Sequence, residues 1–275
     1  MADFSVSNLL DSKIAVVRDV VCSGECRHRS DEECTHRTHL VFPYRGLFVR
    51  HVGREDVVAE SNQLLCFNPY EGYQVSHPVA GGDACLDLQL DEAVLHELVP
   101  AELLQRGTNA LAMQRRRIDP RAQALVALLR HSLHRGVAET LEAETLVLTL
   151  VRRAFGERTS HGVRGSLGRR KLVDRAKLVI ASDLARRWTL AEIADEVGVS
   201  PVYLTQVFSQ VEGMPLYRYQ LRLRLGRALD LLGACDDLTQ LGLELGFSSH
   251  SHFSAAFRQA YGRSPAEFQR SLHLR

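Results

Sequence analysis

The chain has 275 residues, of which 45% are hydrophobic and 24% charged. This is the composition of a globular protein, which excludes a disordered or fibrous chain, and the length predicts two domains. No run of about 18 apolar residues could span a bilayer, and the first ten residues lack the pattern of a secretory signal, so we expect a cytoplasmic protein. Residues 168–275 hold 15 Lys and Arg against 11 Asp and Glu, whereas the rest of the chain is slightly acidic. The basic part is the natural candidate to bind a polyanion.

The first part, residues 1–118, is expected to be rich in β-strands. Short apolar runs alternate there with turn signals containing Gly, Pro and Asn. The runs are residues 40–42, 47–49, 64–67 and 86–90. This rhythm predicts a small antiparallel β-barrel or sandwich and, with the helices that follow, an α+β fold.

Residues 119–157 change to helical spacing and are interrupted at Gly136, which predicts a helical hairpin. Its apolar face either packs on the β-rich part or pairs with a second copy, and periodicity does not separate these two readings. Residues 158–169 contain few apolar side chains and several glycines and are predicted to be a linker. Residues 170–275 are predicted to be entirely helical.

The C-terminal part contains an internal repeat, because residues 190–200 and 238–248 match in their apolar positions. The match includes a small residue, Ala194 or Gly242, and a turn glycine, Gly198 or Gly246. Two helices that cross closely over a tight turn require both features, so the repeat predicts two helix-turn-helix units. Capping patterns at residues 189–192 and 237–240, and Ser-Pro at residues 200–201, mark the helix starts.

The second helix of each unit is predicted to have one buried and one outward face. The outward residues are Val202, Thr205, Gln206 and Ser209 in the first unit and Ser251, Ser254, Ala255 and Arg258 in the second. Small and polar side chains of this kind fit a DNA major groove and reach base edges. For one isolated helix, the alternative is a solvent-exposed face without a binding role. The presence of two matching copies favours the DNA-reading interpretation over this alternative.

Residues 216–232 predict a helix that links the two units. At 1.5 Å per residue it is about 25 Å long, so the unit centres could lie roughly one DNA turn, ~34 Å, apart. Its arginines, among them Arg218, Arg222 and Arg224, are candidates for phosphate contacts.

The C-terminal motifs resemble those of the AraC/XylS transcriptional regulators. The resemblance covers about residues 170–270 and includes the pattern Gly-Phe-Ser-x2-Ser-x-Phe-x3-Phe-x3-Tyr-Gly-x-Ser-Pro-x2-Phe of residues 246–268. It implies a double helix-turn-helix domain that binds double-stranded DNA, with base contacts from Val202, Thr205, Gln206, His250, Ser251 and Ala255. Ala255 and His252 depart from the usual residue types, which weakens base reading by the second unit. The resemblance also implies a cupin-like N-terminal sensor domain and a hairpin that forms a homodimer.

Three thiols and three imidazoles lie between residues 22 and 39. Thiolates and imidazoles at such spacing suit a tetrahedral zinc site, for which we select Cys22, Cys26, Cys34 and His36. Oxidant sensing by these cysteines is a second interpretation and an inert cluster a third.

Other polar and sulfur-containing side chains of the β-rich part are expected to line a pocket or to lie in the core. His51, His77 and Glu71 are expected to line a pocket or to belong to the core rather than to bind a cupin metal, because the clustered His-x-His pattern is missing. Cys66 and Cys85 are expected to be small core residues.

Together these features predict a DNA-binding transcriptional regulator that is not an enzyme. An activator is the preferred interpretation, although these residues do not separate activation from repression. Its N-terminal part would respond to a metal, an oxidant or a small molecule. The alternative is a cupin-type or thiol-dependent enzyme with an attached DNA-binding module, and a protein-interaction module is a third class.

Overall fold

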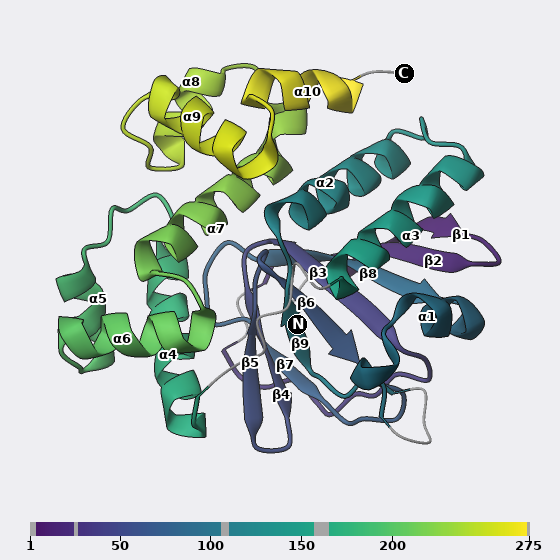
Figure 1. Cartoon of the computed structure of the whole chain (residues 1–275), viewed down its shortest axis with the longest axis horizontal. Helices are drawn as coiled ribbons and strands as arrows, with labels where there is room; N and C mark the ends of the chain where they lie inside the picture. The colour runs from purple at the N-terminus through teal and green to yellow at the C-terminus, as the bar shows by residue number, and fades with distance from the viewer. Residues whose placement is uncertain (1–3, 25–26, 106–109, 157–164, 274–275) are drawn as a thin grey trace. The chain divides into compact units, whose positions relative to one another are not determined.

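The computed structural model describes residues 4–24, 27–105, 110–156 and 165–273. The chain divides into two compact units, Met1–Ser160 together with Leu272–Arg275, and His161–Ser271, and the elements are labelled in Figure 1. The first unit combines strands with helices, and the described part of the second contains helices without strands. The predicted α+β class is therefore confirmed. None of the helices in the described ranges is long and apolar enough to cross a membrane.

The described residues of the N-terminal unit form two antiparallel sheets. The larger sheet has six strands in the order β1-β2-β8-β3-β6-β9, and the smaller has the order β5-β4-β7. The strands are β1 (Phe4–Asp11), β2 (Ala15–Cys22), β3 (His39–Arg45), β4 (Phe48–Val52), β5 (Glu55–Ala59), β6 (Gln63–Phe67), β7 (Gln74–Ser76), β8 (Asp83–Leu90) and β9 (Arg115–Arg117). Because β1 and β9 lie at opposite edges of the larger sheet and do not pair, the predicted closed barrel is corrected to two open sheets.

The central strands β3, β6 and β8 of the larger sheet are buried on both faces, which explains why they are almost continuously apolar. Leu40 and Phe42 of β3 join a core that includes helical residues, whereas Val41 between them points to the opposite side. There it packs with Phe48 of β4 and Val57 of β5. The alternation along one strand thus fills two apolar layers.

Helices α1 (Glu92–Leu98), α2 (Pro120–His134) and α3 (Thr140–Phe155) belong to the same unit. Figure 1 shows α2 and α3 side by side, and their buried residues share the apolar core of the larger sheet. Gly136, between them, has φ of 62°. The predicted hairpin is present, and its buried face packs within its own unit.

The C-terminal unit contains α4 (Leu167–Ser182), α5 (Leu190–Val197), α6 (Pro201–Glu212), α7 (Leu216–Leu231), α8 (Leu238–Glu244), α9 (His250–Tyr261) and α10 (Pro265–His273). Helix α4 begins at Leu167, so the last three residues of the predicted linker 158–169 are helical. Residues 157–164 lie outside the described part of the chain. The described linking helix, α7, ends one residue before the predicted end of 216–232 and continues into a 3-10 turn.

Candidate nucleic-acid interface and sensor cavity

Two helix-turn-helix units are built alike in the C-terminal unit. Helices α5 and α6 form the first, and α8 and α9 form the second. The turn glycines Gly198 and Gly246 have φ of 72° and 80°. A Cβ on Gly242 would lie 3.1 Å from the Cβ of Phe253, so a small residue is required where α8 crosses α9. The structure thus contains the close crossing that the repeat predicts.

The helix starts are fixed by side-chain caps. Thr189 and Glu192 form the predicted reciprocal capping box of α5. Asp237 caps α8 by accepting from the N–H groups of Thr239 and Gln240, but the Gln240 amide donates to Glu244 at 3.0 Å. The second cap therefore works through Asp237 alone. Ser200 and Ser249 cap the second helix of each unit.

The outward face of α6 contains the residues predicted for base contact. Val202 is 69% exposed, Thr205 and Gln206 are exposed and Ser209 is half-buried. The opposite face packs into the core of the first helix-turn-helix unit through Leu204, Val207, Phe208 and Val211. The helix therefore offers a short polar and apolar surface without a long charged side chain.

The outward face of α9 begins with His250, Ser251 and Ala255, which are all exposed. The imidazole Nε2 of His250 lies 3.2 Å from the hydroxyl of Ser254 one turn later. His252 instead packs its ring on Phe247, with ring centroids 5.4 Å apart. His252 therefore fills an aromatic role in packing, which accounts for its departure from the usual residue type.

The arginines of α7 do not share one environment. Arg218 is exposed, and Arg222 is half-buried beside Tyr261. Arg224 is turned into the unit, where its guanidinium donates to the carbonyl oxygens of Leu184, Ala185, Arg186 and Gly246 at 2.8 to 3.3 Å.

The prediction that Arg224 contacts phosphate is therefore corrected. Its guanidinium N–H groups donate to carbonyl oxygens of the loop before α5 and of the turn between α8 and α9. Arg224 therefore links the two helix-turn-helix units. Helical periodicity could not reveal this role, because the four carbonyl groups come from loops distant in sequence. Desolvation lowers the pKa of Arg224, in keeping with its partial burial.

A buried ion pair in the same unit was not predicted. Lys177 of α4 is fully buried, and its ammonium group lies 2.6 Å from a carboxylate oxygen of Glu212 at the end of α6. A lysine within an apolar helical stripe was the signal that could have identified it.

The residues selected for a zinc site do not all come together. Cys22 is buried at the end of β2, Cys34 is exposed and Cys26 lies outside the described residues. His36 packs against the ring of Tyr70 at 5.7 Å. Among the described residues, the cluster of potential metal ligands that contains Cys22 includes His77 and Asp83 instead of Cys34 and His36.

The cluster opens into a cavity of about 620 Å³ that reaches from the larger to the smaller sheet. His77 lines this cavity, as expected, whereas His51 and Glu71 are not among its lining residues. His51 lies 2.6 Å from a carboxylate oxygen of Asp56 and 2.9 Å from the hydroxyl of Ser76, so it joins β4 to its neighbours.

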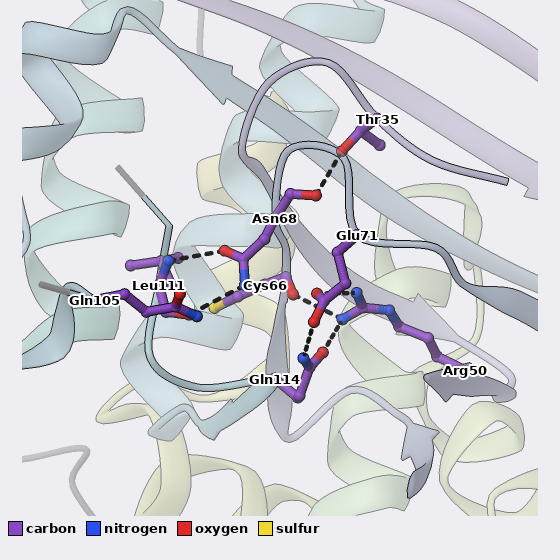
Figure 2. Close-up of polar contacts among 8 residues, drawn as sticks. All are labelled: Thr35, Arg50, Cys66, Asn68, Glu71, Gln105, Leu111 and Gln114. Carbon is purple, nitrogen blue, oxygen red and sulfur yellow. Dashed lines mark hydrogen bonds and ion pairs between the residues drawn. The ribbon is translucent and has the colours of Figure 1, made fainter. Parts of the chain in front are cut away.

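A fully buried arginine supports one wall of this cavity. The guanidinium of Arg50 lies 3.9 Å from the ring centroid of Phe67 and 5.5 Å from that of Tyr73, and both rings line the cavity. As Figure 2 shows, Arg50 also donates to the Cys66 carbonyl at 2.7 Å and pairs with Glu71 at 3.1 Å. Glu71 therefore has a positioning role behind the cavity wall.

The same network fixes the segment that precedes β9 (Figure 2). The Gln114 amide accepts from Arg50 and donates to Glu71, both at 2.7 Å. Asn68 exchanges two hydrogen bonds with the backbone of Leu111, at 2.8 and 3.0 Å. These contacts support the cavity wall from behind.

The remaining buried cysteines are poor redox candidates. Burial raises the pKa of the Cys66 thiol to about 12 and that of Cys85 well above its ordinary value. A thiol that stays protonated is a weak nucleophile. Both residues are buried as expected for core positions.

Comparison with known proteins gives one family match within the C-terminal unit and several matching relatives. A family described as "Helix-turn-helix domain" matches residues 193–271. The HTH-type transcriptional regulator ArgR of Pseudomonas aeruginosa is 38% identical over 93 residues, which are 34% of this chain and 28% of that protein. A putative AraC-like transcription regulator of Streptomyces lividans is 31% identical over 153 residues, 54% of this chain and 50% of that protein.

A longer match, at lower identity, is to the probable transcriptional regulator LumQ of Photobacterium leiognathi. It is 23% identical over 242 residues, covering 85% of this chain and 92% of that protein. The chain spans only 28% and 50% of the length of the two relatives above. Through its C-terminal helix-turn-helix domain and these partial matches, the chain is similar to AraC-like transcriptional regulators.

Proposed function

We propose that this protein is a sequence-specific, DNA-binding transcriptional regulator whose N-terminal unit senses a chemical signal. The observation that carries the proposal is the pair of exposed helices, α6 and α9, each presented by its own helix-turn-helix and joined by α7. Helix α7 has 16 residues, which corresponds to about 24 Å at 1.5 Å per residue. A spacer of this length suits two readers in successive major grooves on one side of a duplex.

In this proposal Val202, Thr205, Gln206 and Ser209 of α6 face base edges in one groove. Because Gln206 offers both a donor and an acceptor, it suits an adenine edge. In the next groove His250, Ser251 and Ala255 of α9 are the facing residues, and they offer fewer long polar side chains. Sequence reading is therefore assigned mainly to α6, with α9 adding contacts that are weaker in base discrimination.

Backbone contacts are assigned to Arg218, which is exposed at the start of α7, and to Arg222. Phosphate neutralisation supplies affinity without base preference and makes binding fall steeply with salt. A module that docked only on apolar protein surfaces would lack this steep dependence.

The sensing role is assigned to the N-terminal cavity, with a metal, an oxidant or a small molecule as the signal. An effector acts by binding one arrangement of the regulator better than another.

We further propose that the regulator acts in the cytoplasm, activates transcription and works as a homodimer. Since the buried face of α2 and α3 already packs in its own unit, a dimer has the outward side of α3, where Leu141 is 73% exposed, available for contact. Sedimentation of the full chain tests the dimer. The enzyme alternative is less favoured, because the two helix-turn-helix units account for the architecture of the C-terminal unit without catalysis.

The test is selection of preferred duplexes from a randomised pool by the full-length protein, followed by fluorescence anisotropy against salt. Affinity should fall linearly on a log–log plot as salt rises. Gln206→Ala should relax the preference at one base pair by about 1–3 kcal/mol.

Thr205→Ala has a matched control in Thr145→Ala of α3. Both threonines are exposed, and each hydroxyl donates to the carbonyl four residues earlier, at 3.0 Å in Thr205 and 2.7 Å in Thr145. Only Thr205→Ala should change the selected sequence. Equal effects of the two variants, or affinity that does not respond to salt, would contradict the proposal.

A further inference from the structure

Three metal-ligand side chains converge where the two sheets of the N-terminal unit meet. Their donor atoms, the thiol of Cys22, an imidazole nitrogen of His77 and a carboxylate oxygen of Asp83, all lie within 4.8 Å of one another. Cys22 is the last residue of β2 and Asp83 the first of β8, and the two residues pair directly in the antiparallel ladder. His77 follows β7 of the smaller sheet. The topology therefore brings together donors that are 61 residues apart in sequence at most.

Two glycines hold the backbone tightly around this cluster. Gly82 has φ of 69°, and a Cβ there would lie 2.3 Å from the Cys22 carbonyl oxygen. Gly46 has φ of 62°, and its Cβ would lie 2.2 Å from the Gly82 carbonyl oxygen. Such close approach leaves little freedom to the main chain beside Cys22 and Asp83. The donors are thus positioned in advance, as a metal site requires.

The surroundings favour a cation. The described residues that line the cavity include four carboxylates, from Asp31, Glu33, Asp83 and Asp87, against the single guanidinium of Arg18. The Asp83 side chain is only 8% exposed and that of His77 13%. Asp31 and Glu33 are exposed, whereas the buried Asp83 carboxylate is costly unless a cation or a proton accompanies it.

The donor set selects the class of metal. A thiolate, an imidazole and a carboxylate together suit a borderline ion such as Zn²⁺, whereas Ca²⁺ and Mg²⁺ prefer oxygen ligands alone. Donors on one tetrahedral zinc ion are separated by roughly 3.3–3.7 Å, given metal–ligand distances of 2.0–2.3 Å. The three donors lie within 4.8 Å of one another, and His77 and Asp83 are in hydrogen-bond contact, so a shared ion would move these two donors slightly apart and draw in the Cys22 thiol.

We propose that Cys22, His77 and Asp83 bind one zinc ion, or a similar divalent transition metal, with the remaining coordination position facing the cavity. The site keeps Cys22 from the ligand set expected from sequence and replaces Cys34 and His36. A bound ion joins β2 and β8 of the larger sheet to the segment after β7 of the smaller one. A site with three protein ligands and one open position admits a further ligand from the cavity. The proposal concerns the N-terminal unit alone and does not depend on DNA binding.

The competing interpretation is a metal-independent contact, in which the His77 imidazole simply hydrogen-bonds the Asp83 carboxylate beside a buried thiol. The two interpretations differ in measurable ways. A metal site gives stoichiometric metal, a thiolate-to-metal absorption band with Co²⁺, and stabilisation by added metal. A hydrogen-bonded pair gives none of these.

The experiment uses the full-length protein, stripped with a chelator under reducing conditions and titrated with Zn²⁺ or Co²⁺. We expect one equivalent to bind, a Co²⁺–thiolate charge-transfer band to appear, and the thermal unfolding temperature to rise. Cys22→Ser should abolish the band, and His77→Ala and Asp83→Asn should each weaken metal affinity at least 10-fold, by analogy with the 10–100-fold losses seen for outer partners of metal ligands.

Cys34→Ser and His36→Ala are the matched controls, because they remove the same donor types outside the cluster. Both should leave the stoichiometry and the band unchanged. The chelated variants are compared with chelated wild type, so a variant that fails to fold is recognised by its metal-free unfolding temperature. Cys22→Ala then provides a second replacement that introduces no polar group.

The proposal is overturned if the reduced wild-type protein binds less than one equivalent under these conditions. It is equally overturned if the Co²⁺ band survives Cys22→Ser, or if Cys34→Ser or His36→Ala removes it. Failure of DNA selection would leave these readouts unaffected, because they report only on metal bound by the N-terminal unit.

Discussion

The ammonium group of Lys177 lies 2.6 Å from a carboxylate oxygen of Glu212, and both side chains are buried. Asp174, one turn earlier on α4, lies 4.0 Å from the same ammonium group, and the ring of Tyr219 is 5.4 Å away. The pair joins α4 to the end of α6. It therefore fixes the position of the first reading helix from its far end.

Replacing Lys177 alone should destabilise the C-terminal unit strongly. Lys177→Met removes the ammonium group that pairs with the buried Glu212 carboxylate, and breaking a buried ion pair typically costs about 3–5 kcal/mol. The double variant Lys177→Met, Glu212→Gln should recover part of that loss, because the buried Glu212 charge is removed while the Asp174 carboxylate keeps its charge. Urea unfolding followed by the fluorescence of Trp188, the one tryptophan of the chain, measures both. A single-variant cost below about 1 kcal/mol, as for an exposed pair, would refute the argument.

The two turn glycines should respond very differently to alanine. Gly198→Ala places a Cβ in open space, so its cost is confined to the left-handed backbone, about 1–2 kcal/mol. A Cβ on Gly246 would lie 2.1 Å from the Ala185 carbonyl oxygen and 3.0 Å from the Arg224 guanidinium carbon. Gly246→Ala should therefore cost at least twice as much in the same unfolding assay. Equal losses of unfolding free energy in the two variants would mean that the Ala185 loop moves to accommodate the new Cβ at no cost in stability.

This contrast marks the limit of what the sequence could predict. The repeat correctly predicted both turns, since a positive φ and a close helix crossing leave local signatures in Gly198, Gly242 and Gly246. It could not separate Gly246 from Gly198, because the distinction depends on a loop about 60 residues earlier. Arg224 was misassigned for the same reason. Its partners are carbonyl groups, which carry no sequence signal.

The N-terminal unit was predicted less completely. Strands β3, β4, β6 and β8 coincide with the expected apolar runs, but β2 was missed because charged residues interrupt it. Asp19 in β2 is buried and is stabilised there by the Tyr44 hydroxyl at 2.6 Å and the His134 imidazole at 2.5 Å. The cluster of Cys22, His77 and Asp83 could not be read from spacing, because it depends on the pairing of β2 with β8.

The capping box of α5 should make stability depend on pH in the acid range. Hydrogen bonds from the backbone and hydroxyl of Thr189, and then from Arg186, lower the pKa of Glu192 to about 2. Since this is below the unfolded value of about 4.3, the ionised carboxylate stabilises the folded state above the unfolded pKa. That contribution is lost as pH falls through the folded pKa.

The difference in unfolding temperature between wild type and Glu192→Gln should therefore shrink between about pH 4.5 and pH 2. Glu196→Gln, an exposed glutamate of the same helix outside the capping box, is the control. A difference that stays constant with pH would contradict the assigned role. So would an equal pH dependence in the control variant.

Variants of Arg218 and Arg224 in α7 should have different effects, because Arg218 is assigned to DNA contact and Arg224 to support of the fold. Arg218 is exposed, so Arg218→Ala should leave unfolding nearly unchanged and reduce the slope of log affinity against log salt by about one unit. Arg224→Ala removes donors to four carbonyl groups that join the two helix-turn-helix units. It should lower the unfolding temperature and weaken DNA binding while the salt slope stays the same.

Anisotropy titrations at several salt concentrations, with Trp188 fluorescence for unfolding, measure both effects. If Arg224→Ala reduced the slope as Arg218→Ala does, the inward role assigned to Arg224 would be wrong, because a side chain occupied by carbonyl groups does not release counterions from DNA.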